Sequence, residues 1–498
     1  MLKNLSIQRF DIIMNQSDYP AANIFIYHFL RLLKIHSGDF QVENREQYKR
    51  LLMFFSSALV LLIQVAIFAY VWTRYYNFSS VIGTLYWRRG NWALFGIYAL
   101  INFFFSKILG AYRVGYLKVS EVVLSQVMAV LLCNAVTYIQ LALIGRWRFM
   151  AFIEPIIAMT FYDIFVVVIW VMFTRWIYAK IYPPRRMLLV YGKINPGTLI
   201  KKIRVRNDKY TISAGICIDK GLDEITQKIE NYEAVLIGDI PSSYRNKLLK
   251  YCFENSIRCY SIPKISDIMI KSSATINLFD TELLLYRNRG LTIEQRLLKR
   301  LMDILVSFIV LIVFSPVLIL VAISIKLYDG GPILYKQERL TRDRKVFMIY
   351  KFRSMSVNSE KDGAELAKKN DSRITPVGKI IRQIHIDELP QLFNIIKGDM
   401  SFVGPRPERP EIAELYKESI PEFDFRLKMK AGLTGYAQVF GKYNTTPLDK
   451  LKLDLTYIEN YSFFLDIVII MQTVKILFIK ESTEGLESGQ KTALSSKK

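Results

Sequence analysis

The sequence predicts a membrane protein in which four transmembrane helices precede a parallel α/β module and a small, mostly helical α/β domain. Three features predict this fold. Four long apolar runs fall within residues 51–182, strand and helix patterns alternate over residues 183–290, and a fifth apolar run opens a basic region at residues 291–480. Of the 498 residues, 52% are hydrophobic, which is typical of a chain with membrane segments.

The net charge of +23 restricts the class of partner. An excess of Lys and Arg indicates nucleic acid, anionic lipid or phosphate-bearing substrates. No nucleic-acid motif accompanies the charge, so we expect no nucleic-acid partner. Beside membrane segments, lipid headgroups explain a positive surface with fewer assumptions, and membrane lipid is therefore the expected partner.

Each of the four apolar runs is long enough to cross a bilayer, which takes about 20 residues in a helix, although Lys107 interrupts the second near its end. Basic residues follow the fourth run closely, and the positive-inside rule places that end in the cytoplasm. Asp163 lies within the fourth run, where we expect it to be paired or to face the bundle interior, with a functional role as the alternative. The four runs are Leu52–Trp72, Trp92–Tyr112, Val122–Ile144 and Pro155–Thr174.

The two ends of the chain are predicted to lie outside these elements. Residues 1–50 form a cytoplasmic or interfacial segment, in which Ala21–Ile35 has apolar residues at helical spacing. That stretch is either an interfacial helix or a helix packed on the protein. Residues 481–498 are rich in Ser, Gly, Lys and Glu, a composition typical of a disordered tail.

Residues 183–290 alternate between strand and helix patterns, which indicates βαβ units and a parallel, Rossmann-like sheet. A glycine-containing turn, residues 192–197, follows the first strand. It lacks the middle glycine of GxGxxG, and Pro196 stands where a helix should open. A structural or regulatory module is therefore favoured over a dinucleotide site. The predicted strands are Met187–Tyr191, Thr211–Ile218, Ala234–Ile240 and Arg258–Ile262, with a helix at Tyr244–Phe253.

The fifth apolar run, Ile304–Ile325, is interrupted near its middle by Ser315 and Pro316. Proline removes one helical hydrogen bond and clashes with the preceding turn. The run is either a kinked span or a re-entrant hairpin that returns to the side from which it entered. We favour the hairpin, because everything after it is polar and rich in residues that bind phosphate, which belongs in the cytosol.

An acidic pair, Asp387 and Glu388, stands at the start of a short helical pattern in this last region. Pro390 is tolerated in the first turn of a helix, and Lys397-Gly398 is a natural end. The positive N-terminal end of the helix would favour the ionised acids. Asp387 is then either a simple helix cap or a catalytic group. The apolar positions that predict the helix are Leu389, Leu392, Phe393 and Ile396.

Basic residues surround the acidic pair in the sequence and favour the catalytic interpretation. The guanidinium group of Arg can donate two parallel hydrogen bonds to a phosphate, and the ammonium group of Lys adds positive charge, so both suit a substrate with several phosphates. A carboxylate that attacks phosphorus among such charges needs screening by a metal, and a region rich in carboxylates with few histidines suits magnesium. His385 lies next to the acids in the sequence, and we interpret it as a residue that packs locally rather than as a catalytic group.

Several motifs in this region resemble the bacterial sugar transferase family, the monotopic polyprenyl-phosphate glycosyl-1-phosphate transferases. The resemblance covers about residues 295–475, and the preceding spans with a Rossmann-like module resemble the long-form members. The matching motifs include Ser315-Pro316, GGPILYKQERL at 330–340, YKFRSM at 350–355, DELPQLFNIIKGDMSFVGPRPE at 387–408 and KAGLTGYAQVFGKYN at 430–444.

The resemblance implies a fold with a re-entrant helix hairpin beside a small α/β active site. It also implies a two-step transfer of sugar 1-phosphate from a nucleotide sugar, with Asp387 as the nucleophile. Glu388 would be the second acid, which helps to hold magnesium or handles the proton of the acceptor, and the implied metal ligands are Asp387 and Glu388. The acceptor would be undecaprenyl or another polyprenyl phosphate, in the first membrane step of exopolysaccharide, capsule or O-antigen synthesis. The implied location is the bacterial inner membrane, with the active site cytoplasmic. Phosphate or substrate would be bound by Lys351, Arg353, Arg382, Gln391 and Arg406.

Two other functions fit parts of the sequence. A non-catalytic scaffold could keep this fold, although the intact acids and basic residues argue against it. A nucleotide-sugar-modifying enzyme could use residues 186–290, although the degenerate glycine turn argues against that. UDP-glucose, UDP-galactose and N-acetylated UDP sugars are all donors that the sequence allows, and a homodimer is compatible with the long form.

Overall fold

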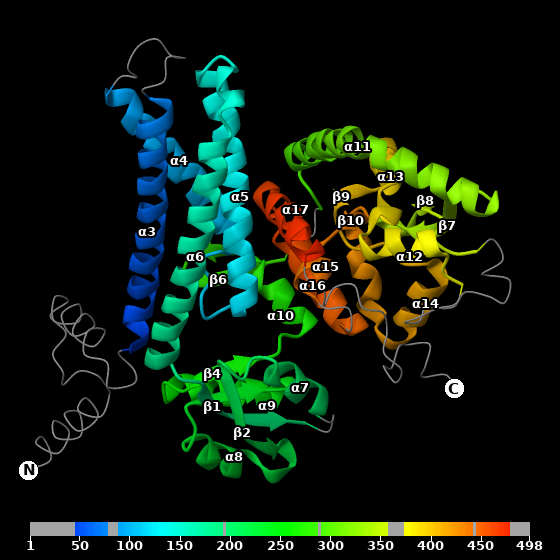
Figure 1. The fold of residues 1–498 in the computed structure, drawn as a ribbon. Helices are drawn as coiled ribbons and strands as arrows, with labels where there is room; N and C mark the ends of the chain where they lie inside the picture. The colour runs from blue at the N-terminus through cyan, green and yellow to red at the C-terminus, as the bar shows by residue number, and fades with distance from the viewer. Residues whose placement is uncertain are drawn as a thin grey trace, which may run out of the picture. The chain divides into compact units, whose positions relative to one another are not determined.

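The computed structural model describes residues 45–77, 88–192, 196–286, 290–356, 373–441 and 445–478. The proposed helix at Ala21–Ile35 and the proposed tail 481–498 lie outside the described residues. By its contacts the chain divides into two compact units, residues 1–103 with 134–174 and residues 104–133 with 175–498 (Figure 1). The predicted limits of the individual domains stay predictions.

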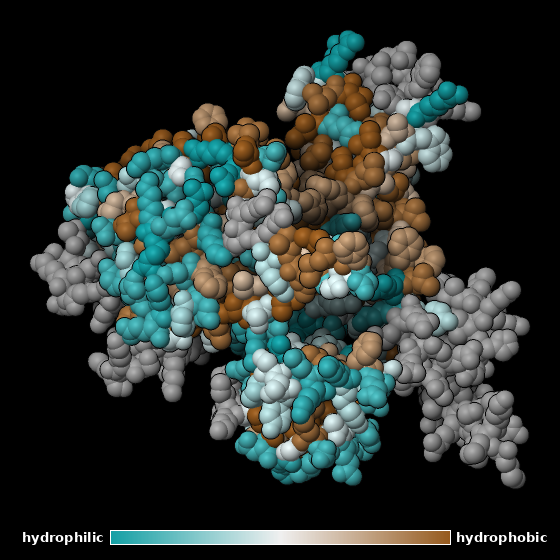
Figure 2. Space-filling view, turned by 180° about the vertical axis from the view of Figure 1, so that it is seen from behind, coloured by the Kyte–Doolittle hydropathy of each residue, from teal (hydrophilic) through white to brown (hydrophobic). Residues whose placement is uncertain are grey.

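Among the described residues, five helices are long and apolar enough to cross a membrane, and each coincides with one of the five predicted runs. The second helix ends at Ile108, before the predicted end of its run at Tyr112. Large hydrophobic side chains are exposed along these helices, among them Phe54, Leu100, Phe161 and Leu320. Figure 2 shows extensive hydrophobic surface, coloured brown. Such surfaces are stable in lipid rather than in water. The helices are α3 (Arg45–Val71, continued by a π-helix, Trp72–Tyr76), α4 (Arg88–Ile108), α5 (Val119–Ile144), α6 (Glu154–Ile181) and α11 (Ile293–Asp329).

Asp163 lies inside the first unit, as predicted. Its carboxylate is fully buried and accepts hydrogen bonds from Asn134 at 3.1 Å and Tyr98 at 3.3 Å. In the same unit, the hydroxyl groups of Ser56 on α3 and Thr174 on α6 form a hydrogen bond at 2.9 Å. Buried polar groups within membrane helices need such partners, because hydrocarbon offers none. The acid therefore ties helices together.

The predicted Rossmann-like module is present as a parallel sheet in the order β2-β1-β3-β4. A helix begins at Gly197 with Pro196 as its N-cap, so the proline marks the start of a helix rather than preventing it. An antiparallel hairpin, β5 (Ala274–Leu278) and β6 (Thr281–Leu285), follows. The sheet and its helices are β1 (Arg185–Tyr191), α7 (Gly197–Arg204), β2 (Tyr210–Cys217), α8 (Leu222–Ile229), β3 (Ala234–Ile237), α9 (Ser242–Glu254), β4 (Arg258–Ser261) and α10 (Ile265–Lys271).

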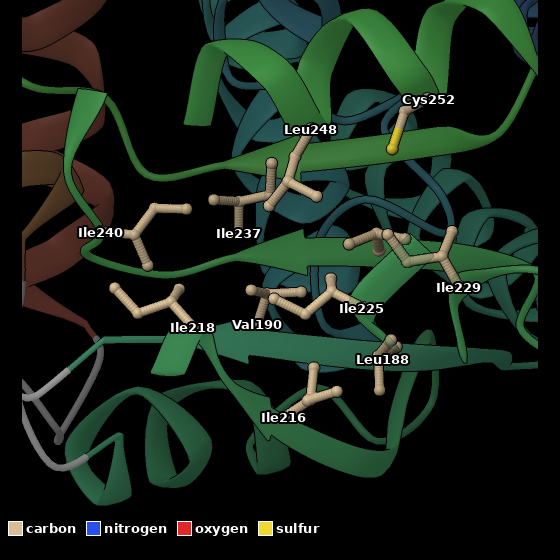
Figure 3. Packing of buried hydrophobic residues seen from close by; sticks show 11 residues of the cluster. Leu188, Val190, Ile216, Ile218, Ile225, Ile229, Ile237, Ile240, Leu248 and Cys252 are labelled. Carbon is tan, nitrogen blue, oxygen red and sulfur yellow. The ribbon is translucent and has the colours of Figure 1, made fainter. Parts of the chain in front are cut away.

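The core of this module lies between the sheet and the helices that cover it (Figure 3). Val190 on β1, Ile225 on α8 and Leu248 on α9 are fully buried there. Apolar side chains from successive strands and helices meet because parallel strands need crossover helices on their faces. The core explains why the module's strands could be recognised from short apolar runs.

The helix α11 opens the last domain and encloses Pro316. Proline has no N–H to donate to the Ile312 carbonyl. The Ser315 hydroxyl donates to that carbonyl instead, at 2.8 Å. The helix is therefore continuous through the Ser-Pro pair, although Figure 1 shows it changing direction along its length. Its re-entrant course through lipid stays a prediction.

The remaining elements of this domain pack around two short sheets. Strands β7 and β8 form an antiparallel hairpin, and β9 pairs with β10 in parallel. Buried residues from β8, α13 and β9, including Ile349, Leu392 and Val403, share one core. The elements are β7 (Leu334–Leu340), β8 (Val346–Phe352), α12 (Pro376–Gln383), α13 (Gln391–Lys397), β9 (Ser401–Val403), α14 (Pro410–Ser419), β10 (Gly432–Thr434), α15 (Tyr436–Phe440), α16 (Pro447–Glu459) and α17 (Phe463–Leu477).

Replacing Gly432 by alanine is expected to destabilise this domain, by roughly 1–3 kcal/mol for overpacking. A Cβ atom there would lie 2.1 Å from the Gly404 nitrogen and 2.5 Å from the Thr434 oxygen, both backbone atoms that cannot move aside freely. Thermal unfolding of the full chain in detergent measures the effect. Gly96→Ala is the matched control, since its Cβ would meet nothing within 4 Å. Equal melting of both variants would contradict the expected clash.

Candidate active site

Asp387 and Glu388 lie in one turn of 3-10 helix, Ile386–Glu388, just before α13. The Leu389 N–H donates to the Ile386 carbonyl at 3.1 Å, which closes this turn. The prediction that both acids sit at the start of the helix with Pro390 in its first turn is therefore wrong in detail. Pro390 is the N-cap, and the helix begins at Gln391, because the acids already belong to a tighter turn.

The helix α13 is held on strand β8 by a buried amide. The Asn394 side chain accepts from the Tyr350 N–H at 3.0 Å and donates to the Met348 carbonyl at 2.8 Å. This pairing brings the acidic turn close to Lys351, the next residue on the strand. The predicted apolar face is only partly buried, because Phe393 and Ile396 are exposed.

Glu388 is the centre of a tight ion cluster. Its carboxylate accepts from Lys351 at 2.7 Å and from Arg406 at 2.7 and 3.3 Å. Burial alone would raise the pKa of Glu388, but Arg406 and Lys351 outweigh it and hold that pKa well below its usual range. Glu388 is thus ionised at neutral pH, and it fixes two cations beside Asp387.

Asp387 differs from its neighbour, because its carboxylate makes no hydrogen bond or ion pair with the residues that the structure describes. Burial, followed by the charge of Glu388, raises the pKa of Asp387 to about 6, against the pull of Lys351, Arg382 and Arg406. Two adjacent acids with pKa values pushed apart can take different chemical roles. Asp387 is a carboxylate that is ionised at neutral pH and available to react.

The structure brings together four of the predicted site residues, Lys351, Asp387, Glu388 and Arg406. Arg382 acts on Asp387 through its charge, and its Nη1 is buried without a partner among the described residues. The same holds for the Nε2 of Gln391. Buried donors without partners are costly, and a bound anion would satisfy them.

Arg353 and His385 have more local surroundings. Arg353 forms an ion pair with Asp329 at the end of α11, an acid that sequence reasoning did not single out. Arg353 therefore ties the end of β8 to the end of the apolar helix. His385 adopts a left-handed conformation with φ of 58°, and burial lowers its pKa. This left-handed residue stands at the N-cap of the turn that carries Asp387 and Glu388.

The donor atoms at the site fit magnesium only with help from a substrate. Within the described ranges, no group of three or more His, Cys, Asp or Glu side chains gathers that could hold a metal ion. Asp387 has a free carboxylate, whereas Glu388 is already paired with two cations. Magnesium commonly takes one or two carboxylates and completes its shell with waters and substrate phosphates, so the pair is compatible with it.

These features define a membrane-associated domain in which one carboxylate, without a partner among the described residues, lies beside a cluster of basic side chains. Residues 294–480 match the family model described as bacterial sugar transferase. A relative from Caulobacter vibrioides, named UDP-glucose:undecaprenyl-phosphate glucose-1-phosphate transferase, is 36% identical over 189 residues, which are 37% of this chain and 71% of the relative. The chain belongs to the bacterial sugar transferase family.

Two further relatives differ in the sugar in their names. The UDP-N-acetylgalactosamine-undecaprenyl-phosphate N-acetylgalactosaminephosphotransferase of Aeromonas hydrophila is 43% identical over 36% of this chain and 43% of its own length. The undecaprenyl-phosphate galactose phosphotransferase of Salmonella typhimurium is 35% identical over 44% of this chain and 49% of its own length. The chain thus matches about half of these two relatives or less.

Proposed function

We propose that the protein transfers a sugar 1-phosphate from a UDP sugar to undecaprenyl or another polyprenyl phosphate, releasing UMP. The observation that carries the proposal is the contrast between a free Asp387 and a Glu388 bound to Lys351 and Arg406. The relatives whose names state this reaction with three different sugars support it. The reaction would be the first membrane step in building a polysaccharide repeat unit.

In the first step, a carboxylate oxygen of Asp387 attacks the phosphorus that carries the sugar. The bond from that phosphorus to the bridging oxygen breaks, and the oxygen leaves with UMP. In the second step, an oxygen of polyprenyl phosphate attacks the same phosphorus and frees Asp387, forming a polyprenyl diphosphate sugar. A covalent intermediate splits one difficult transfer into two easier ones.

The cations around Glu388 hold the phosphates during both steps. Lys351 and Arg406 each lie 2.7 Å from the same Glu388 oxygen, Oε1. Glu388 keeps them in place and, with its lowered pKa, stays charged rather than carrying a proton. The unpartnered nitrogen atoms of Arg382 and Gln391 would receive further phosphate oxygens.

Magnesium is proposed as the cofactor, with Asp387 and Glu388 as its protein ligands. When bound, it would neutralise phosphate charge and so reduce repulsion towards the attacking carboxylate. The chain's own residues still supply the nucleophile and the fixed cations.

A panel of nucleotide sugars tests the reaction. The full-length protein in detergent is incubated with polyprenyl phosphate, magnesium and one donor at a time, with UDP-glucose, UDP-galactose and their N-acetylated forms first. UMP release in the presence of one or more donors is the expected result. Release of UDP instead would contradict cleavage between the two phosphorus atoms, and no release from any donor would reject the function.

The site is proposed to face the cytoplasm of a bacterial inner membrane, with four spans, α3 to α6, and a re-entrant α11. We expect a cysteine placed at Gln295 and one placed at Lys345 to react from the same, cytoplasmic side. These two positions lie on either side of the apolar part of α11. The measurement is labelling by a membrane-impermeant maleimide in intact and lysed spheroplasts, with the native cysteines, Cys133, Cys217, Cys252 and Cys259, replaced.

If each of the two single-cysteine variants is labelled only after lysis, both positions are cytoplasmic, which agrees with a re-entrant helix. Labelling of the Lys345 position in intact spheroplasts would make α11 a full span and would remove the active site from cytosolic UDP sugars.

A further inference from the structure

The residues on either side of Arg406 are fixed by buried groups. Strand β9 leads into the turn, and the Gly404 N–H donates to the Thr434 carbonyl at 2.8 Å. After the turn, Arg339 donates to the Pro407 carbonyl at 3.1 Å. The backbone that carries Arg406 is therefore held at both ends, as expected for a group that must meet Glu388 closely.

The carbonyl of Arg406 itself has a charged donor. Nη2 of Arg426 donates to this oxygen at 2.8 Å. Arg426 is 2% exposed, although it lies outside every part of the site described so far. A buried guanidinium is expensive unless acids surround it, so its surroundings indicate what it does.

Two acids hold Arg426 in this position. Nη2 of Arg426 lies 2.8 Å from Asp454 on α16, and Nη1 lies 3.5 Å from Glu408. Lys450 donates to the same Glu408 carboxylate at 2.8 Å. Burial would raise the pKa of Glu408, but Lys450 and Arg426 lower it to about 2. Glu408 is therefore ionised, and the hydrogen bond from Arg426 to the Arg406 carbonyl links this cluster to the turn that carries Arg406.

We propose that Arg426 is a positioning residue, which holds the backbone of Arg406 so that the Arg406 guanidinium stays on Glu388. The inference rests on the proposed function, because its effect is read out in sugar phosphate transfer. A planar fork can meet Asp454, Glu408 and the carbonyl together, whereas a lysine is a single point charge that can reach only some of them. Movement of a group at an active site by about 1 Å can cost about 100-fold in rate.

A double-mutant cycle separates positioning from simple loss of stability. The rate of UMP release is measured for the full-length protein with polyprenyl phosphate and the donor that the panel identifies, giving kcat and KM for each variant. We expect Arg426→Lys to lower kcat/KM by about 10- to 100-fold. Arg406→Ala alone should lower it by about 100-fold, and the double variant should lose no more than Arg406→Ala.

Arg245→Lys is the matched control. Arg245 also forms a fork-like pair with an acid, Asp267, in the Rossmann-like module, and it should keep wild-type rates. If Arg426→Lys does not fold, Asp454→Asn, which removes a partner of Arg426, takes its place in the cycle. Rates of the Arg426 or Asp454 variant equal to wild type, or losses that multiply with Arg406→Ala, overturn the positioning role. A wild-type protein that releases no UMP rejects the proposed function instead.

Discussion

Replacing Asp387 by asparagine is expected to lower transfer by at least about 10³-fold, because an amide cannot replace a carboxylate as the nucleophile. Asparagine has nearly the same size, and Asp387 makes no bonds with the described residues that the change would break. The folded state should even gain stability at pH 7.5. A carboxyl whose pKa is raised by folding from 3.8 to about 6 costs stability as the pH rises between these two values, and the full cost is present above about 6. Melting and UMP release are measured side by side.

The same variant tests the covalent intermediate. With donor but no polyprenyl phosphate, the wild-type protein should release about one equivalent of UMP and gain the mass of a sugar phosphate on the Asp387 peptide. Asp387→Asn should do neither. Asp343→Asn, an exposed acid paired with Arg342, is the control and should keep full activity. A mass gain in Asp387→Asn, or on another residue of the wild-type protein, would move the nucleophile elsewhere.

Much of the fold could be predicted from short stretches of sequence, because apolar runs and strand patterns reflect the burial of the same residues that form them. The five apolar runs are long helices, and the four strands of the Rossmann-like sheet begin within two residues of their predicted starts. A parallel strand buried on both faces needs a continuous apolar run, such as residues 187–190. The catalytic pair could be located from its own motif and the basic residues around it.

The groups that set the geometry of the site could not be predicted in this way, because their partners lie far away in the sequence. Asp329 pairs with Arg353, and Lys299 on α11 donates to Asp466 at 2.7 Å and to the Val403 carbonyl at 2.9 Å. The residues that neighbour each of these groups in the sequence do not indicate which distant residue it will pair with. A usable signal was present, namely a single charge within an apolar stretch, as for Asp466 in FFLDIVII, which indicates a buried pair.

The short helix after the acids shows a different limit. Phe393 is 54% exposed, whereas Asn394 beside it is fully buried. Periodicity assigned the apolar residue to the core, but a polar side chain that satisfies two backbone groups of β8 took the buried position. Leu392 is buried as predicted, so hydrogen bonding to a neighbouring strand changed part of the face that hydrophobicity alone predicts.

Replacing Glu388 by glutamine is expected to have the second-largest effect, a fall in kcat/KM of about 100-fold near neutral pH. Glutamine keeps the shape but removes the charge that holds Lys351 and Arg406 at 2.7 Å. Both cations would lose their buried counter-charge and move, so the phosphates would be held less well. Glu414→Gln, an exposed acid paired with Arg344, is the control.

The pH dependence distinguishes this loss from loss of the nucleophile. Asp387 must be ionised to attack, so the wild-type kcat/KM should fall about tenfold per pH unit below a pKa of about 6. The charge of Glu388 helps to raise that pKa, and the three nearby cations oppose it. Without the charge of Glu388 the pKa of Asp387 falls, and the acid limb moves to lower pH. Glu388→Gln should therefore be slower at neutral pH yet keep its rate further into acid, whereas Asp387→Asn should be low at every pH. An acid limb that stays near pH 6 in Glu388→Gln would show that the two carboxylates are not coupled.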